Sequence, residues 1–385
     1  MHSKVRAYQV TTREAAEYLL RADKSLCLVG PPGSGKTRLA VLLAEERGYD
    51  YEFVTGREDL NYSDLMDVEE GALARSVIRT WARYTCGKTP VWFIFDEVNR
   101  ARVEVVLGEV FTLLDVDHRV RFTLLRPSEE LARVLRESVR EECGSLNPVA
   151  EKLAEYASRR GLPMPLAWRM IATMNLLDMG HLYRIGYAFA RRAPLLPVTS
   201  LGHIVEVPED LEPARPGRTD ICAESVRSTL ADLPKAVRRE PWSLLPRNVV
   251  ARFEAPLAPL DTERIAPHLT APSRLWAIVE EVSRHFERLG LLVGPALYVD
   301  ACRLLAANLA VPHELLADVI VASLLAPQLT FVAPRARLET ALGHTYTIQA
   351  LQELLGVTEK LLGPKSLSSW AVRAYVAQIA PIGSV

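Results

Sequence analysis

The sequence predicts an α/β fold built on a parallel sheet, and three segments support this prediction. Residues 26–29 are a short apolar run that precedes a glycine-rich turn and then residues 37–46, where apolar side chains recur at helical spacing. Residues 51–56 have the composition of a strand, and residues 90–95 form a second continuous apolar run. Continuous runs of this length are typical of strands that are buried on both faces in a parallel sheet.

The turn at residues 30–37 has the pattern G-x-x-x-x-G-K-T of a Walker A loop. Its glycines allow backbone N–H groups to surround an anion, and the following helix adds the partial positive charge of its N-terminus. Lys36 can reach the β- and γ-phosphates, and the Thr37 hydroxyl can bind Mg²⁺. The alternative is a strand-to-helix turn without a ligand. The predicted nucleotide-binding residues are Gly30, Pro31, Pro32, Gly33, Ser34, Gly35, Lys36, Thr37 and Arg38.

The apolar run at residues 90–95 ends in two carboxylates, Asp96 and Glu97, as a Walker B strand does. Ligands of open α/β sheets bind at the carboxyl ends of the strands, so we expect both carboxylates beside the phosphate loop. Asp96 is predicted to hold Mg²⁺ directly or through water, and Glu97 to orient and polarise the attacking water. The two motifs together predict hydrolysis of a nucleoside triphosphate.

Composition indicates two or more packed units with little net charge. The chain has 385 residues and a formal net charge of −1, which gives no global reason to expect binding to nucleic acid or to a membrane. We expect no membrane span, because apolar runs are short, and no signal peptide. The five cysteines are scattered without a C-x-x-C pair, which predicts reduced thiols in a cytoplasmic protein. Histidines do not cluster at ligand spacing, so no transition-metal site is predicted.

Four segments resemble AAA+ ATPases of the McrB and MoxR type. Residues 96–101 read D-E-V-N-R-A, similar to the D-E-I-N-R signature of this clade, and residues 108–115 continue that block. Residues 168–178 resemble the fourth core strand of the family, which ends in T-M-N-x-x-D. Residues 186–192 are similar to the A-L-x-R-R stretch that supplies the arginine finger. The resemblance extends, in the correct order, over roughly residues 10–195.

The resemblance implies a three-layer AAA+ core with a parallel five-stranded sheet, followed by a smaller α-helical lid. It implies that Asn175 is sensor 1, which holds the water against the γ-phosphate, and that Arg191 or Arg192 is the arginine finger. Which of these two arginines is the finger stays open. A finger that acts on a neighbouring subunit implies a homo-oligomeric ring, with six subunits expected. The predicted catalytic residues are Lys36, Glu97, Asn175, Arg191 and Arg192, with ATP and Mg²⁺ as cofactors and Thr37 and Asp96 as metal ligands.

Three regions are predicted along the chain. Residues 1–195 form the core, with a helical insertion at about 127–162, and residues 196–260 are a proline-rich linker or insertion. Residues 261–385 form the lid and further C-terminal helices. Residues 119–124 are expected to be a strand of a hairpin like the one that these ATPases insert near the central pore.

Two activities remain open. A MoxR-like ATPase that remodels a protein partner, such as a von Willebrand-type protein, agrees with the near-neutral charge and with a phosphate loop at residue 30, which we expect to leave no room for an N-terminal DNA-recognition domain. The alternative is an McrB-like motor that acts on DNA with a nuclease subunit and uses ATP or GTP. A nucleotide-dependent switch without turnover is disfavoured by intact Glu97, Asn175 and the arginine pair. Arg274 and Arg303 are weak candidates for a sensor 2 arginine.

Overall fold

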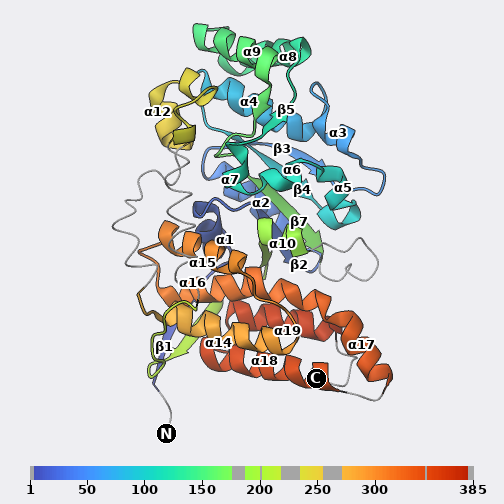
Figure 1. Ribbon diagram of the computed structural model, residues 1–385, viewed down its shortest axis with the longest axis vertical. Helices are drawn as coiled ribbons and strands as arrows, with labels where there is room; N and C mark the ends of the chain where they lie inside the picture. Colours follow the sequence, from blue (N-terminus) through green and yellow to red (C-terminus); the bar gives the residue numbers. More distant parts are fainter. Residues whose placement is uncertain are drawn as a thin grey trace. The chain divides into compact units, whose positions relative to one another are not determined.

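The computed structural model describes residues 4–175, 187–199, 202–217, 235–254, 271–342 and 345–379. The chain divides into two compact units, which we describe separately (Figure 1). The sheet unit contains Asp23–Ala193 and Arg227–Asp261, and the helical unit contains Met1–Ala22, Pro194–Val226 and Thr262–Val385. Neither unit is contiguous in sequence, and the three successive regions expected from the sequence stay a prediction.

A five-stranded sheet has the strand order β3-β4-β7-β2-β8. Its strands are β2 (Leu26–Gly30), β3 (Asp50–Thr55), β4 (Val91–Asp96), β7 (Met170–Asn175) and β8 (Leu195–Pro197). The pairs β3–β4, β4–β7 and β7–β2 are all parallel. β2 is buried throughout, and β4 and β7 are buried except at their last residue, which explains their continuous apolar runs. The predicted fold class is confirmed.

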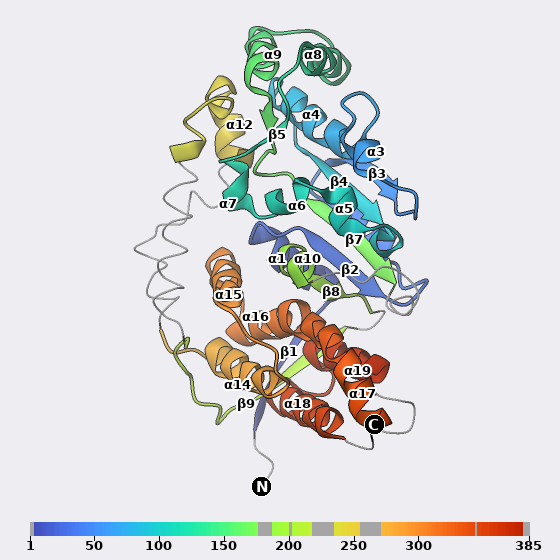
Figure 2. The same cartoon turned by 45° about the vertical axis from the view of Figure 1, so that its right-hand side comes forward.

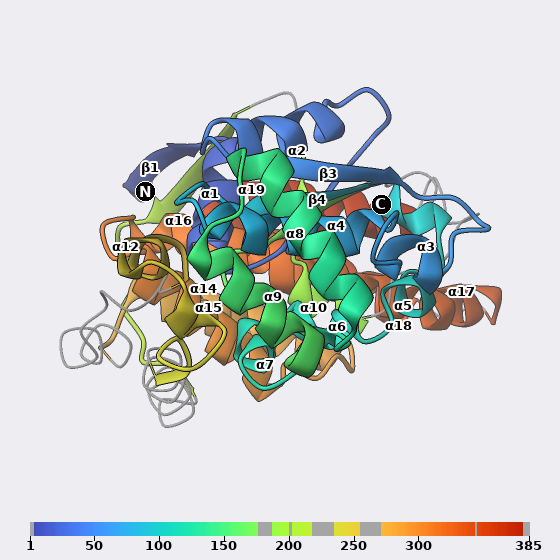
Figure 3. The same ribbon diagram turned by 90° about the horizontal axis from the view of Figure 1, so that it is seen from above.

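Helices cover the sheet. α2 (Lys36–Glu45), which follows β2 in the sequence, packs on β2, β3, β4 and β7. α4 (Ala72–Tyr84) packs on β3 and β4. Figure 3 shows β3 and β4 between α2 and α4, which gives the three layers expected for this fold. Shorter helices in Asp23–Ala193 include α3 (Tyr62–Met66), η1 (Val98–Arg100), α5 (Val103–Leu107), α6 (Val110–Leu113), α7 (Val116–Arg119) and α10 (Tyr187–Arg192).

Two helices, α8 (Glu129–Cys143) and α9 (Pro148–Arg160), form the predicted insertion. Each begins at a capping side chain, since Ser128 Oγ and Asn147 Oδ1 accept the N–H groups of Leu131 and Ala150. Both views in Figure 1 and Figure 2 place α8 and α9 side by side next to α4, against which α8 packs. The insertion is therefore an antiparallel helix pair carried by the sheet unit.

A short antiparallel pair closes the base of the insertion. β5 (Thr123–Leu125) enters it and pairs with β6 (Leu162–Pro163), which leaves it. Gly161 has φ +74°, and a Cβ there would lie 2.1 Å from the Leu125 carbonyl oxygen, so only glycine allows this close approach.

The predicted strand at residues 119–124 is wrong, because α7 extends to Arg119 and only residues 123–125 are extended. The Arg119 side chain is buried, and its guanidinium donates to the carbonyls of Leu113 (2.6 Å) and Trp168 (2.7 Å). Burial and the nearby Arg169 lower the pKa of Arg119 to about 9. These contacts fix Arg119 in the core of the unit.

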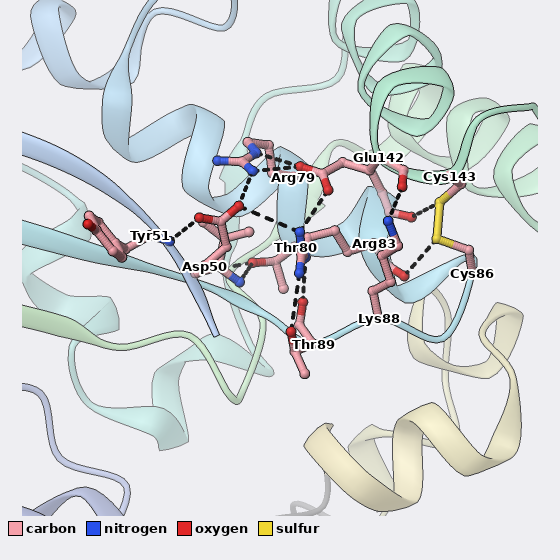
Figure 4. Close-up of polar contacts among 12 residues, drawn as sticks. Asp50, Tyr51, Arg79, Thr80, Arg83, Cys86, Lys88, Thr89, Glu142 and Cys143 are labelled. Atoms are coloured by element: carbon pink, nitrogen blue, oxygen red, sulfur yellow. Dashed lines mark hydrogen bonds and ion pairs between the residues drawn. A yellow bond between two sulfur atoms is a disulfide. The ribbon is translucent and has the colours of Figure 1, made fainter. Parts of the chain in front are cut away.

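A disulfide joins the insertion to the core, which contradicts the prediction of reduced thiols. Cys86, just after α4, is bonded to Cys143, the last residue of α8, across 57 residues of sequence. Figure 4 shows Glu142 beside this bond; its carboxylate lies 2.7 Å from both Arg79 and Arg83 of α4. Cys302 is also disulfide-bonded. The fold brings distant cysteines together, which a search for short spacings cannot detect.

Part of the proline-rich region belongs to the sheet unit. The segment contains η3 (Trp242–Leu244), α12 (Arg247–Val249) and η4 (Val250–Glu254). The buried carboxylate of Glu254 accepts hydrogen bonds from Tyr84 Oη (2.7 Å), Trp242 Nε1 (2.6 Å) and the backbone N–H groups of Leu166 and Ala167. Glu254 thus fastens this segment to α4 and to the loop before β7.

The described residues of the helical unit contain seven α-helices and a two-stranded antiparallel sheet. The helices are α1 (Thr12–Arg21), α14 (Arg274–Arg288), α15 (Pro295–Ala307), α16 (His313–Ile320), α17 (Ala333–Ala341), α18 (Tyr346–Leu362) and α19 (Leu367–Ile379), and β1 (Val5–Val10) pairs with β9 (His203–Pro208). Asp318 of α16 accepts the N–H groups of Leu367 and Ser368, so a buried carboxylate caps α19. Burial raises the pKa of Asp318 to about 6.

One helical stretch of this unit is apolar enough to cross a membrane by length and composition. It runs over His313–Phe331, through α16, η5 (Val321–Leu325) and η6 (Ala326–Phe331), with mean hydropathy 1.5. The expectation that no apolar run approaches this length is therefore wrong. Because 89% of its most apolar 18-residue window is buried inside the protein, the stretch has the burial of a core helix and is weak evidence of a span.

Candidate functional site

The glycine-rich loop has the backbone that its sequence predicts. Gly33 and Gly35 have φ of +76° and +84°, which L-residues with side chains rarely adopt. Gly35 is the N-cap of α2 and has no side chain to bind the first N–H groups of the helix. Those N–H groups and the helix N-terminus are therefore left for an anionic ligand. Pro31, Pro32 and Arg38 are exposed around them.

Lys36 lies folded over its own loop. Its side chain is buried, and Nζ donates to the carbonyl oxygens of Gly30 (3.1 Å) and Pro31 (2.8 Å), with Ser34 Oγ at 3.5 Å. These three oxygens replace water as hydrogen-bond partners of the buried Lys36 ammonium group. A phosphate oxygen can take the place of these carbonyls, because Lys36 already lies within the loop.

One carboxylate oxygen, Asp96 Oδ1, connects the end of β4 to α2 and to β7. It accepts from the Thr37 hydroxyl after β2 at 2.7 Å and from the Thr173 hydroxyl of β7, also at 2.7 Å. Thr37 and Asp96 are the predicted metal ligands, and the structure brings them together. Hydroxyl and carboxylate oxygens are hard ligands of the kind that Mg²⁺ prefers, so these residues fit that ion. Among the described residues, no group of three His, Cys, Asp or Glu side chains is placed to hold a metal.

Thr173 is a functional residue that the sequence reasoning missed. Besides donating to Asp96, its oxygen accepts the backbone N–H of Glu97 at 3.0 Å. Thr173 is 1% exposed, so solvent contributes little to these bonds. The available signal was a hydroxyl in an otherwise apolar strand, two residues before Asn175. Thr173 therefore positions both residues of the Asp-Glu pair.

Glu97 begins a tight turn that depends on Gly56. Glu97 has φ +49°, in the left-handed region, and its carboxylate lies 3.0 Å from Arg100 Nη1. The Gly56 N–H donates to the Asp96 carbonyl at 2.7 Å, and a Cβ on Gly56 would lie 2.3 Å from the Glu97 carbonyl oxygen. A glycine after β3 is therefore required for the backbone position of Glu97.

Asn175 is the last residue of β7 and lies opposite Gly30 in the parallel register. The predicted sensor amide is thus at the same edge of the sheet as the first residue of the loop. Residues 176–186, which include Asp178 of the T-M-N-x-x-D block, lie outside the described residues.

The two predicted finger arginines both bind Asp115, in the turn between α6 and α7. Arg191 Nη2 lies 2.8 Å and Arg192 Nε 3.0 Å from Asp115 Oδ2. Of the sensor 2 candidates, Arg274 pairs with Glu314 at 3.4 Å, and Arg303 is buried within the helical unit.

Among the comparisons with known proteins, one family model matches the part of the chain that carries this site. Residues 25–193 match the family model described as an AAA domain of the dynein-related subfamily. No curated protein matches. A solved structure of C. elegans PCH-2 is similar at 15% sequence identity, over 77% of this chain and 67% of that chain, with a TM-score of 0.21. Residues 25–193 are therefore similar to an AAA domain, and the parallel strand order of the sheet is consistent with that fold. The McrB and MoxR branch stays a prediction.

Proposed function

We propose that this chain hydrolyses ATP with Mg²⁺ as one subunit of an AAA+ ring, and that hydrolysis drives the remodelling of a protein partner. AAA+ domains support nucleotide-driven remodelling in general. The observation that carries the proposal is the sharing of Asp96 Oδ1 by the hydroxyls of Thr37 and Thr173, with Glu97 as the next residue. A structural turn has no need for this convergence of oxygens at the end of a glycine-rich loop.

The phosphate end of the substrate is assigned to the loop. Lys36 would exchange the carbonyls of Gly30 and Pro31 for the β- and γ-phosphate oxygens, and the N-terminus of α2 would face the same anions. Thr37 and Asp96 would hold Mg²⁺, which when bound neutralises charge on the transferring phosphoryl group.

The water is assigned to Glu97 and Asn175. Glu97 would orient the water and accept its proton, and the Asn175 amide would hold it against the γ-phosphate. Glu97 pairs with Arg100 in the structure, so its carboxylate has to exchange this partner for the water. The negative charge that remains on the transferring γ-phosphoryl group would be stabilised by Arg191 or Arg192 of a neighbouring subunit. This arrangement requires a ring, with six subunits expected.

A protein partner agrees with the near-neutral net charge of −1. The McrB-like motor on DNA is the second candidate, because the T-M-N sequence of β7 is closer to that branch. A cytoplasmic location is part of the proposal, since ATP is the substrate. The Cys86–Cys143 disulfide would then be one of those that intracellular proteins retain chiefly in hyperthermophiles.

Steady-state hydrolysis of ATP and GTP with Mg²⁺ tests the proposal. We expect Glu97→Gln to lower kcat by about 100-fold, because it removes the base, and to leave the affinity for a fluorescent ATP analogue unchanged. Glu141→Gln, on the exposed face of α8, is the matched control and should retain wild-type kcat. Equal rates for wild type and Glu97→Gln would contradict the assignment.

The same assay addresses assembly and partner. Specific activity that rises with protein concentration would support sites shared between subunits. Stimulation by duplex DNA would favour the motor, and stimulation by a von Willebrand-type protein would favour the remodelling ATPase. Chelation of Mg²⁺ should abolish hydrolysis.

A further inference from the structure

The arginine pair of α10 shares one carboxylate. Arg191 and Arg192 both bind Asp115 Oδ2, at 2.8 and 3.0 Å. The Asp115 side chain is 8% exposed, whereas those of Arg191 and Arg192 are 27% and 17% exposed. Two guanidinium groups that bind the same oxygen lie close enough to repel each other, and the negative charge of the carboxylate offsets this repulsion. Asp115 therefore determines where both positive charges lie.

Asp115 is itself held in place by the core. It occupies the N-cap position of α7, yet its side chain accepts no N–H of that helix and binds the arginines instead. The carbonyls of the two preceding residues, Leu113 and Leu114, accept from the buried guanidinium of Arg119, which also donates to the Trp168 carbonyl before β7. The turn that carries Asp115 is thus joined to the strand that ends in the sensor amide.

The two arginines are not equivalent. Arg192 also donates to the Ala188 carbonyl at 3.3 Å, and its guanidinium lies 4.9 Å from the centre of the Phe111 ring. For Arg191, Asp115 is the partner that the structure gives among the described residues. Arg191 can therefore leave by breaking one ion pair, whereas Arg192 is held by three contacts.

We propose that Asp115 is the positioning residue of the arginine finger, that Arg192 is the fixed anchor, and that Arg191 is the finger. Arg191 leaves Asp115 to bind the γ-phosphate of the nucleotide in the neighbouring subunit, and its charge is paired in both positions. Asp115 keeps Arg192 when Arg191 leaves, so no unpaired carboxylate is left in this half-buried turn. This inference rests on the proposed function and specifies the residue that completes its site.

Single substitutions separate the three roles. Arg191→Ala and Arg191→Lys should both lower kcat by at least about 100-fold, because an ammonium cannot reproduce the guanidinium fork. Arg192→Lys should retain most of the activity that Arg192→Ala loses, because a lysine can still pair with Asp115 and pack on Phe111. Arg160→Ala, on the exposed end of α9, is the control. An active Arg191→Ala beside an inactive Arg192→Ala would overturn the assignment.

For Asp115, the informative readouts are kcat and rescue. Asp115→Asn should lower kcat by about 10-fold with unchanged KM, because the nucleotide site of the same subunit is intact. Asp115→Glu, which restores the carboxylate, should recover part of the loss. In the Arg191→Ala background, Asp115→Asn should add little further loss, since its effect acts through Arg191. Full activity of Asp115→Asn would overturn the inference.

Mixed rings test whether Asp115 acts through the finger. Glu97→Gln subunits lack the base but have an intact finger, whereas Arg191→Ala and Asp115→Asn subunits have the base but an absent or misplaced finger. We expect mixing with Glu97→Gln to restore activity to both. If mixing restored hydrolysis to Arg191→Ala but not to Asp115→Asn, the inference about Asp115 would be overturned and the proposed function would stand. Wild-type hydrolysis without any restoration would overturn the shared site, and absence of wild-type hydrolysis would overturn the proposed function.

Discussion

Replacement of Thr173 by valine would remove the hydroxyl that connects Asp96 to Glu97 and would keep the shape of the side chain. In the structure this hydroxyl donates to Asp96 Oδ1 at 2.7 Å and accepts the Glu97 N–H at 3.0 Å. Thr173 is 1% exposed, so water cannot easily take over either bond. The substitution therefore removes one hydrogen bond to a charged group and leaves one N–H without its acceptor.

The magnitude follows from these two losses. A hydrogen bond to a charged group contributes about 1.5–3 kcal/mol, and an unsatisfied buried donor costs about 1–3 kcal/mol. Since Asp96 retains the Thr37 hydroxyl and can relax toward it, we expect the free energy of unfolding to fall by about 2–4 kcal/mol. We also expect kcat to fall by about 10-fold, because Glu97 loses the bond that fixes its backbone.

Urea unfolding and steady-state hydrolysis measure the two effects separately. Thr173→Ser is the matched control, because it keeps the hydroxyl and loses only a methyl group, at about 1 kcal/mol. The serine variant should retain most of kcat, whereas the valine variant should not. A valine variant with wild-type stability and wild-type kcat would refute the role given to this hydroxyl.

Three further substitutions test other parts of the structure. Gly56→Ala should lower kcat by about 10-fold in the same assay, because its Cβ would displace the Glu97 backbone; an unchanged kcat would argue against the close approach. Glu254→Gln should lower the free energy of unfolding, followed by urea titration, by about 3 kcal/mol, because an amide group would face the Tyr84 hydroxyl or N–H donors; an unchanged midpoint would contradict this. The pKa of Asp318, about 6 in the folded protein, is above its ordinary value, so this group's contribution to stability is full below pH 3.8 and is lost as pH rises through 6, by about 3 kcal/mol. Asp318→Asn should remove that pH dependence between pH 4 and 7, and identical pH profiles for the two proteins would rule it out.

Local features of the sequence were sufficient to predict the strands of the sheet and the phosphate-binding loop. Strands buried on both faces must be apolar throughout, so β2 and β4 are visible as continuous runs. The positive φ values at Gly33 and Gly35 require glycine, and these glycines are part of a recognisable motif. The insertion helices were predicted because apolar residues recur along them at helical spacing.

Long-range contacts account for what the sequence did not reveal. Thr173 lies 77 residues from Asp96, and Glu254 lies 170 residues from Tyr84, so neither pair has a local signature. The Cys86–Cys143 bond likewise depends on α4 and α8 packing together. The strand expected at residues 119–124 failed for the same reason, because the tertiary contacts of Arg119 override its local β-forming pattern.

The contacts of Glu254 have a consequence for synthesis on the ribosome. Tyr84, Leu166 and Ala167 are made first, yet the carboxylate that satisfies them is added only after the chain has contributed residues 194–217 to the other unit. The sheet unit therefore completes its core only after residue 254 has left the exit tunnel. Until then water, and not the Glu254 carboxylate, has to accept the N–H groups of Leu166 and Ala167, so this part of the sheet unit stays incomplete for the time that the segment takes to translate.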